Sequence, residues 1–537
     1  MKQFFYRKFN TWRQQQRLLF LLLTLITGIV VLFPYLNFQL HLSPGDHGRD
    51  LYSFKKTFEG ALLYRDYRSQ NGPLMPYYYS LFYRLFGVSV QSTLWGYNLL
   101  ILLTGILLYG AGTTFLSPGM AYLATLWYWA FCTNEFYYTF NHNGAVFFII
   151  AVVFCLLRYI KAPRRKYVFW AYFCLVGATL VRPDIGLAGY AAFYLSLIMV
   201  QRGKNKTGLK QLLRRYLPLP LILLTLTLAI YLWIGLKAPG PALFKDMAYW
   251  REIKWDRILQ NIFGLKDIFL LTFNHCWPGR SFMLFMALLA IKAFLSRKET
   301  SYRIPEDSRL ALRALLIFIV FLLMEYLLGM RLFRWRWAYA VSLLFAFGLF
   351  EIGISRFRSK KIRAFLICYL LALPMGTAIK NFHFVQSCKV PANHIVIGAN
   401  DFYVDPYQQE NVRTFTRAAE FLRQNTLPDE KILAVPYAPI YYFFSDRDNA
   451  FREMNFFSRM PTADELDKKN INYIIVSNRA VRNADTPNES LGKDFGLEFS
   501  RYLDEHFDEI LTLGDWDQTM GWVIYHGIKI YRRRPGE

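Results

Sequence analysis

The sequence predicts an α-helical membrane protein that crosses the bilayer many times and carries a small α/β domain at its C-terminal end. Three observations predict this fold class. Hydrophobic residues make up 54% of the 537-residue chain, and aromatic residues make up 18%. The apolar residues gather in separate runs that are long enough to cross a bilayer. After Lys380 these runs stop, and the sequence takes on the mixed polarity of a soluble domain.

About eleven membrane-spanning helices are expected from the apolar runs. They fall at 18–35, 92–111, 118–134, 143–160, 166–182, 185–201, 216–236, 281–296, 310–329, 337–355 and 363–379. The segment 261–275 is also apolar, but it is short and interrupted, which favours a re-entrant or interfacial helix. We therefore divide the chain into a transmembrane part (1–390), with a first loop at about 37–91, and a soluble part (391–537).

The basic residues predict how the chain is oriented. Lys and Arg are concentrated at 1–17, 158–166, 202–215, 292–313 and 356–363. With eleven spans and a cytoplasmic N-terminus, all five segments lie on the cytoplasmic side, as the positive-inside rule requires. The chain is then an inner (plasma) membrane protein whose first loop and C-terminal domain are extracytoplasmic.

The C-terminal domain is expected to combine short strands with amphipathic helices. Strands are indicated at Ile432–Val435, Ile471–Ser477, Gly521–Tyr525 and Ile528–Arg532. Apolar residues at helical spacing indicate helices at 409–424 and 496–510.

Charge and motifs exclude several functional classes. The net charge of +25 would suit a nucleic-acid partner, but the basic residues lie in short loops between apolar runs. There they act as topology signals and contact anionic lipid headgroups. The sequence contains no Walker-type glycine loop, no GxGxxG after a strand and no HExxH or zinc-finger spacing. Nucleotide-driven transport and a nucleotide-sugar donor are therefore unsupported.

The first loop holds the densest group of chemically capable side chains, at 45–87. Asp46 and Asp50 are four residues apart, so on a helix they share one face, with Arg49 beside them as a counter-ion. A carboxylate at this position can act as a general base on a hydroxyl group or can bind a divalent cation. The alternative is a solvated loop with ordinary charges.

Further elements follow Asp46 in a fixed order: Gly60, Tyr64-Arg65-Asp66-Tyr67, Gly72-Pro73-Leu74 and Leu85-Phe86-Gly87. This order resembles the first extracytoplasmic loop of the GT-C superfamily of polyprenyl-phosphate-dependent glycosyltransferases. It is most similar to the branch of protein O-mannosyltransferases and aminoarabinose transferases. The resemblance implies that Asp46 is the catalytic or metal-associated carboxylate, with Asp50 as the fallback. Tyr64 and Asp66 become candidate substrate-binding residues, although Asp66 also suits the scaffold of the loop.

The resemblance also implies a second acid before the fourth span, and this sequence departs from that pattern. Asn141 and Asn143 stand nearest to the expected position, and the nearest carboxylate is Glu135. Amides in place of an acid weaken the metal hypothesis, but Asn can bond a sugar hydroxyl and His142 can bond a phosphate. The alternative for His142 is an interfacial polar residue.

A late loop carries arginines on the side where basic residues are disfavoured. Arg331, Arg334 and Arg336 alternate with aromatic residues before the tenth span. Their guanidinium groups suit the phosphate of a lipid donor, as the resemblance also implies. The alternative is that they snorkel at helix ends. Arg182 is a further candidate, although it can simply pair with Asp184 at a helix start.

Together these observations predict an inverting hexosyl- or pentosyltransferase that uses a polyprenyl-phosphate sugar donor. The acceptor is a lipid, a glycan or a protein, and nucleic acid is not a partner. Asp46 serves the acceptor and the arginine loop binds the lipid phosphate. A divalent cation, Mg²⁺ or Mn²⁺, held by Asp46 is an open alternative. The competing hypothesis is a transporter or flippase of an anionic lipid-linked glycan that performs no chemistry, although no paired repeats are evident.

Overall fold

The protein is described here from a computed structural model. The structure describes residues 2–535 apart from 41, 70, 136–139, 206–210, 212–213, 215–217, 238–304, 328–335, 356, 358, 457–458, 479–480, 484–485, 490, 493–494 and 517–526.

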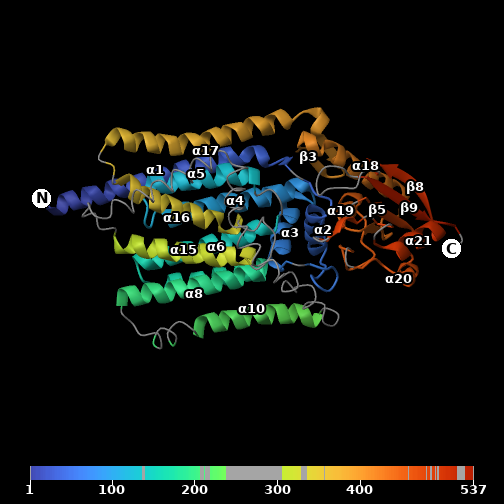
Figure 1. Cartoon of the computed structure of the whole chain (residues 1–537), viewed down its shortest axis with the longest axis horizontal. Coiled ribbons are helices and arrows are strands. Elements are labelled where there is room, and N and C mark those ends of the chain that lie inside the picture. The colour runs from blue at the N-terminus through green and yellow to red at the C-terminus, as the bar shows by residue number, and fades with distance from the viewer. Residues whose placement is uncertain are drawn as a thin grey trace.

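Long helices lie side by side over most of the molecule, with the N-terminus at one end and the C-terminal sheet at the other (Figure 1). A helix lies over each predicted span except 281–296, which falls outside the described residues. These helices are α1 (Lys2–Leu32), α4 (Val90–Gly112), α5 (Pro118–Glu135), α6 (His142–Lys161), α7 (Arg165–Val181), α8 (Pro183–Asn205), α10 (Pro218–Lys237), α15 (Glu306–Leu327), α16 (Arg336–Ser355) and α17 (Lys360–Cys388).

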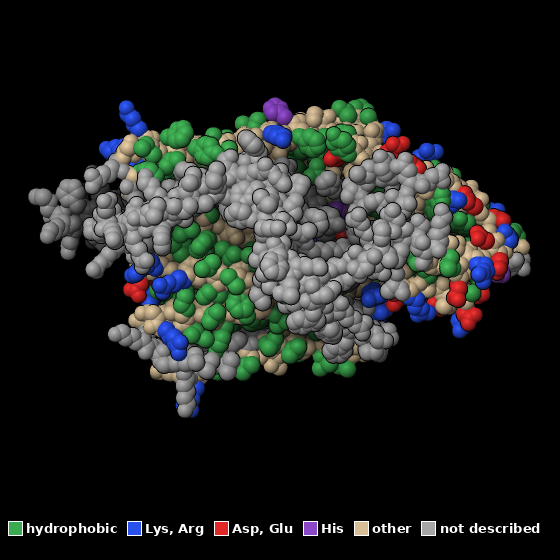
Figure 2. Space-filling model, in the orientation of Figure 1, with side chains coloured by type: hydrophobic (Ala, Val, Ile, Leu, Met, Phe, Trp, Pro, Cys, Tyr) green, Lys and Arg blue, Asp and Glu red, His purple; other side chains and the backbone are tan. Residues whose placement is uncertain are grey.

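Among the described residues, six helical segments are long and apolar enough to cross a membrane. They are Gln14–Tyr35, Val90–Gly112, His142–Lys161, Pro183–Lys204, Trp337–Ser355 and Lys360–Cys388. The fold class is therefore confirmed as helical and membrane-spanning, while the count of eleven crossings stays a prediction. Hydrophobic side chains spread over the outer surface of the helical part, as lipid contact requires, and charged side chains gather over the C-terminal part (Figure 2).

The first loop folds into two short helices at the junction between the long helices and the C-terminal part (Figure 1). They are α2 (Asp46–Phe58) and α3 (Leu74–Phe86). Aromatic packing joins them, since the ring of Phe54 stacks on that of Tyr79 with centroids 4.3 Å apart. Both rings are fully buried, which fixes the face that α2 turns toward the bundle.

A small sheet joins the start of the first loop to the C-terminal part. Its strand order is β1-β3-β2, where β1 is Phe38–Gln39, β3 is Asn400–Val404 and β2 is His394–Ile397. β1 pairs in parallel with β3, and β3 pairs antiparallel with β2. The backbone of residue 38 is thus held by residues that follow the last long helix.

A second sheet has the strand order β4-β5-β9-β8. Its strands are β4 (Leu433–Val435), β5 (Tyr473–Ser477), β9 (Ile528–Arg533) and β8 (Phe507–Leu513). β4 and β5 are parallel and the other pairs are antiparallel. Every residue of β5 is buried in the interior of the sheet, which explains the apolar run from Tyr473 to Val476. The remaining described strands are β6 (Val481–Asn483) and β7 (Thr486–Glu489).

The predicted elements of the C-terminal part can be compared with the structure one by one. Strands occur near 432–435, 471–477 and 528–532, while 521–525 lies outside the described residues. The helix predicted at 409–424 is α18 (Gln409–Asn425), and α19 (Ile440–Ser445) and α20 (Ala463–Lys468) are additional helices. The helix predicted at 496–510 was too long. α21 (Leu497–His506) ends where β8 begins, because Phe507 onward pairs with β9.

Candidate active site

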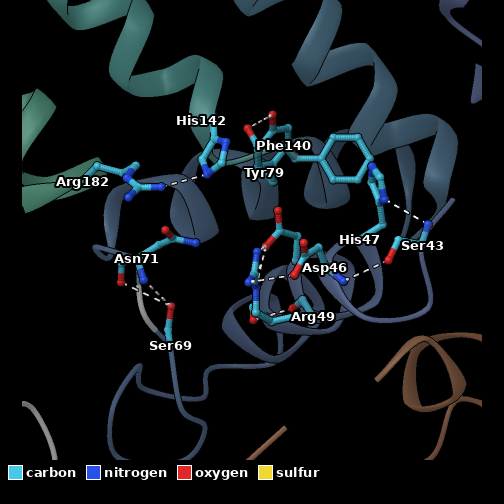
Figure 3. A network of polar contacts seen from close by, with 12 residues as sticks. Ser43, Asp46, His47, Arg49, Ser69, Asn71, Tyr79, Phe140, His142 and Arg182 are labelled. Carbon is cyan, nitrogen blue, oxygen red and sulfur yellow. Dashed lines mark hydrogen bonds and ion pairs between the residues drawn. The ribbon is translucent and has the colours of Figure 1, made fainter. Parts of the chain in front are cut away.

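Asp46 and Arg49 lie together on α2 (Figure 3), and Asp50 shares their face of the helix through its hydrogen bonds with Arg49, as the spacing predicts. Arg49 lies between the two acids. Its Nη1 donates to Asp46 Oδ1 at 3.3 Å, and its Nε and Nη2 donate to Asp50 Oδ1 at 3.0 and 2.8 Å. Two like charges on one helix face would repel each other without this cation. Asp46 is also the first residue of the helix, where a negative charge is favourable.

Burial separates the two carboxylates. The Asp46 side chain is 18% exposed and the Asp50 side chain only 1%. Burial raises the pKa of Asp50, although Arg49 acts in the opposite direction. Burial also works against the charge of Arg49, but Tyr437 and the two acids outweigh it, so the pKa of Arg49 is raised. Asp46 is therefore the more accessible of the two acids, and Asp50 holds Arg49.

Tyr437 brings the C-terminal part into this group. Its hydroxyl donates to Asp46 Oδ1 at 2.7 Å, and Arg49 Nη1 lies 3.3 Å from the same phenol oxygen. Tyr437 is almost completely buried, although it is 391 residues from Asp46 in the chain. The sequence offers no local signal for this contact.

His47 holds α2 against the start of α6. Its Nδ1 accepts a hydrogen bond from the Ser43 backbone N–H at 3.0 Å, and its ring meets the ring of Phe140 edge-on at 5.3 Å. Figure 3 shows both contacts. Sequence reasoning passed over His47 because a histidine beside two acids carries no distinctive spacing.

The residues at the start of α6 connect the carboxylates of α2 to a second polar group, which is formed by His142 and Arg182. The backbone N–H of Asn141 acts on Asp50 and slightly opposes the rise that burial causes in its pKa. The neighbouring His142 accepts from Arg182 Nη1 through Nε2 at 2.8 Å. Because arginine can only donate, Nε2 carries no proton, and the proton of a neutral ring lies on Nδ1. Two consecutive residues, Asn141 and His142, thus reach Asp50 on α2 and Arg182, respectively.

Arg182 is held on three sides. Its Nε donates to Asp184 Oδ1 at 3.1 Å and its Nη2 donates to Asp184 Oδ2, so the pair is bidentate. Its guanidinium lies 4.6 Å from the centre of the Trp337 ring. The pairing with Asp184 matches the simpler of the two sequence interpretations. The contact with Trp337 also brings Arg182 to the start of α16.

Gly72 brings the Asn-Gly-Pro segment of the first loop close to Arg182. Its N–H donates to the carbonyl of Val181 at 2.9 Å, directly before Arg182. A Cβ atom at position 72 would lie 2.1 Å from the Leu180 carbonyl oxygen, so only glycine fits there. Asn71 and Ser69, which are joined by hydrogen bonds, precede Gly72 in the chain (Figure 3).

Asn141 and Asn143, at the start of α6, are buried, each only 3% exposed. Asn141 Oδ1 and Asn143 Nδ2 form no hydrogen bond within the described part of the chain. A buried amide atom without a partner is costly, which favours a bound polar group or water at this position.

The other candidate residues divide into two groups. Tyr64 is fully buried and its hydroxyl donates to the carbonyl of Asn71 at 2.7 Å, while Asp66 bonds Arg65 and the N–H of Leu62. Both contacts hold the loop between α2 and α3. Glu135 ends α5 and Arg336 begins α16, and their side chains are not described. Arg331 and Arg334 lie outside the described residues.

The residues present do not fit a metal at Asp46. Where the structure describes the chain, no three His, Cys, Asp or Glu side chains gather as a metal-binding group. Asp46 instead contacts a guanidinium and a phenol, and the charge of Arg49 would repel a divalent cation. We therefore derive no step through a metal ion.

Comparisons with known proteins identify a matching family model and similar folds. Residues 70–234 match the sequence model of the dolichyl-phosphate-mannose-protein mannosyltransferase family. The crystal structure of ArnT from Cupriavidus metallidurans bound to undecaprenyl phosphate has a TM-score of 0.54 at 13% identity, over 96% of this chain and 97% of that chain. Its apo state has a TM-score of 0.52 at 14% identity with the same coverage.

Arabinofuranosyltransferase AftD from mycobacteria also has a similar structure. Its TM-score is 0.52 at 13% identity, over 96% of this chain and 40% of that chain. No curated protein sequence matches the chain. The resemblance predicted from the sequence is therefore confirmed at the level of fold and family match: the chain has a fold similar to those of ArnT and AftD, and its residues 70–234 match the mannosyltransferase family model.

Proposed function

We propose that this protein transfers a sugar from a polyprenyl-phosphate donor to a hydroxyl group of an acceptor on the extracytoplasmic side of the membrane. The observation that carries the proposal is the group on α2. A partly accessible carboxylate, Asp46, is fixed by Arg49 beside the buried Asp50, at the end of a GT-C type helix bundle.

In the proposed reaction the acceptor oxygen attacks the anomeric carbon of the donor sugar. Asp46 takes the proton of the attacking hydroxyl as a general base. The bond between the anomeric carbon and the phosphate oxygen breaks, and its electron pair leaves with the lipid phosphate. A single displacement of this kind inverts the anomeric configuration. The acceptor is a lipid, a glycan or a protein, and the transferred sugar is a hexose or a pentose.

Arginines are proposed to stabilise the departing phosphate. Arg331, Arg334 and Arg336 precede or begin α16, whose second residue, Trp337, packs on Arg182. Arg182 is already paired with Asp184, so we assign it a structural role. It holds Trp337 at the end of the arginine loop and His142 at the start of α6. Fixed cationic donors that face developing negative charge lower the barrier most strongly where water is excluded. ArnT, which shares the fold, was crystallised with undecaprenyl phosphate.

The test is transfer from undecaprenyl-phosphate sugars by the purified protein in liposomes, with membrane lipids and glycans as acceptors. Asp46→Asn should lower kcat by roughly 10²–10⁴-fold, the usual contribution of a general base. Glu59→Gln is the matched control, because Glu59 caps the far end of α2 and pairs with Lys56 at the surface. Full transfer by a correctly inserted Asp46→Asn protein would refute the assignment.

The competing transporter hypothesis predicts a different result in the same liposomes. A flippase would move the labelled donor across the bilayer and leave it intact. A transferase releases free polyprenyl phosphate and forms a covalent sugar–acceptor product without any gradient. Measuring both species in one reaction separates the two functions.

A further inference from the structure

The C-terminal part touches α2 at its first turn. The N–H of Ile440 donates to the carbonyl of Pro44 at 3.1 Å. A Cβ atom added to Gly48 would lie 2.2 Å from the backbone nitrogen of Ile440. The backbone of α19 therefore lies directly against the turn of α2 that carries Asp46 and Arg49. This approach brings Tyr437, three residues before α19, to the carboxylate.

The hydrogen-bond directions at Tyr437 are fixed by its partners. Arg49 can only donate, so the phenol oxygen accepts from Nη1 at 3.3 Å. The single phenol proton is then directed to Asp46 Oδ1 at 2.7 Å, a distance typical of a hydroxyl that donates to a carboxylate. Tyr437 and Arg49 converge on the same oxygen, which fixes the orientation of the Asp46 carboxylate.

Tyr437 is not needed for attachment of the C-terminal part, because α2 has other contacts with that part farther along its length. Lys55 pairs with Asp446, and Lys56 pairs with Asp448 at 2.9 Å. The hydroxyl of Tyr52 accepts from the backbone N–H of Asn449 at 3.0 Å. Removing one phenol oxygen leaves all three contacts in place.

We propose that Tyr437 is a positioning residue for the transfer reaction, so that the C-terminal part completes the active site by orienting Asp46. This inference rests on the proposed function and adds to it a role for the region after the last long helix. Tyr437 acts through Asp46 and is not itself assigned a contact with the substrate.

The test compares the kinetics of Tyr437→Phe with those of wild type in the full-length protein in liposomes. Loss of a hydrogen bond to a charged group should lower kcat roughly 10-fold to 100-fold, while KM for the undecaprenyl-phosphate sugar stays within about twofold. Tyr442→Phe is the matched control. Its hydroxyl accepts a hydrogen bond from the backbone N–H of Ala434 at 2.8 Å, within the C-terminal part. Both kcat and KM of Tyr442→Phe should therefore stay near their wild-type values.

Two unnatural residues separate the hydrogen bond from the volume of the side chain. Replacement of Tyr437 by 4-aminophenylalanine keeps a donor at the same position and should restore most of kcat. Replacement by 4-methylphenylalanine fills the space without a donor and should behave like Tyr437→Phe. Equal rates for these two proteins would overturn the inference, whatever the folding yield of Tyr437→Phe.

A docking variant distinguishes positioning from attachment. Asp448→Asn weakens the contact with Lys56 without touching Asp46, so its apparent melting temperature should fall while kcat is kept. A kcat as low as that of Tyr437→Phe would show that attachment alone matters, and would overturn the inference. If Asp46→Asn is inactive but Tyr437→Phe keeps the wild-type kcat, this inference is wrong and the proposed function still holds. Active Asp46→Asn would remove the proposed function itself.

Discussion

Asp50 and Asp66 belong to the same loop, but their surroundings move their pKa values in opposite directions. Burial raises the pKa of Asp50, whereas the hydrogen bond from Arg65 lowers the pKa of Asp66. The contribution of Asp50 to stability is therefore complete below the ordinary value of about 3.9 and is lost as pH rises through its raised pKa. The contribution of Asp66 is complete above that value and is lost as pH falls through its lowered pKa.

Opposite pH profiles are expected for Asp50→Asn and Asp66→Asn. Relative to wild type, Asp50→Asn should gain stability as pH rises from about 4 toward neutrality, because wild type then loses the contribution of Asp50. Relative to wild type, Asp66→Asn should be less stable at neutral pH, and this deficit should shrink as pH falls below about 4. The measurement is the apparent melting temperature in detergent across this pH range. Parallel curves for the two variants would contradict the assigned surroundings.

At the scale of elements, the contact between α2 and α19 decides where the Asp46 carboxylate lies. Tyr52 of α2 packs on Tyr442 of α19 with ring centroids 5.1 Å apart, and both side chains are buried. Gly48 allows the close backbone approach at the other end of the same face. A short amphipathic helix of this kind depends on tertiary packing for most of its stability.

Gly48→Ala should separate α2 from α19. The added methyl group meets backbone atoms of Ile440, which cannot move aside as a flexible side chain can. Overpacking of this kind costs about 1–3 kcal/mol, which opposes the gain of about 1 kcal/mol in helix propensity. We expect a lower apparent melting temperature and reduced transfer.

Gly376→Ala is the control for this prediction. Gly376 lies in α17, and a Cβ atom there would meet nothing within 4 Å. The substitution should be neutral or stabilising by up to about 1 kcal/mol. If both glycine variants melt at the wild-type temperature, the close contact at Gly48 is not present in solution.

At the scale of the whole molecule, one hydrophobic core continues across residue 390. It runs from the long helices through the first loop into α18 and α19. The ring of Phe38 meets that of Phe384 in α17 edge-on, with centroids 6.3 Å apart. Phe402 of β3 belongs to the same core. A second, smaller core lies around the four-stranded sheet and includes Leu433, Ile474 and Phe507. The change of composition near residue 390 is thus not a break in packing.

A chain that ends at residue 390 should therefore lose transfer activity and expose α2. In the full chain Lys55 and Lys56 pair with Asp446 and Asp448, and their side chains are only 7% and 18% exposed. Without that cover, trypsin should cut after these lysines much faster than in the full protein. The measurement is a time course of limited proteolysis together with the transfer assay. Wild-type transfer by the shortened chain would show that the two parts act independently.

Much of the fold could be predicted because it depends on local patterns. The apolar runs located the long helices that the structure describes, and the spacing of Asp46, Arg49 and Asp50 predicted a shared helix face. The prediction of a helix at 496–510 was wrong at its C-terminal end. There β8 pairs with the distant strand β9, and this pairing overrides the helical pattern. The pairing of His142 with Arg182 joins residues 40 apart, and no local pattern specifies it.

The sequence by itself determined which segments are apolar, which loop carries the acids and which residues share a face of α2, because these properties depend on composition and helical period. Only the tertiary structure decided that Asp50 is buried, that Asp46 stays accessible, and that Tyr437 bonds it across 391 residues. Burial and long-range contacts depend on how α2 packs against α6 and α19, and a carboxylate takes its chemical character from that packing.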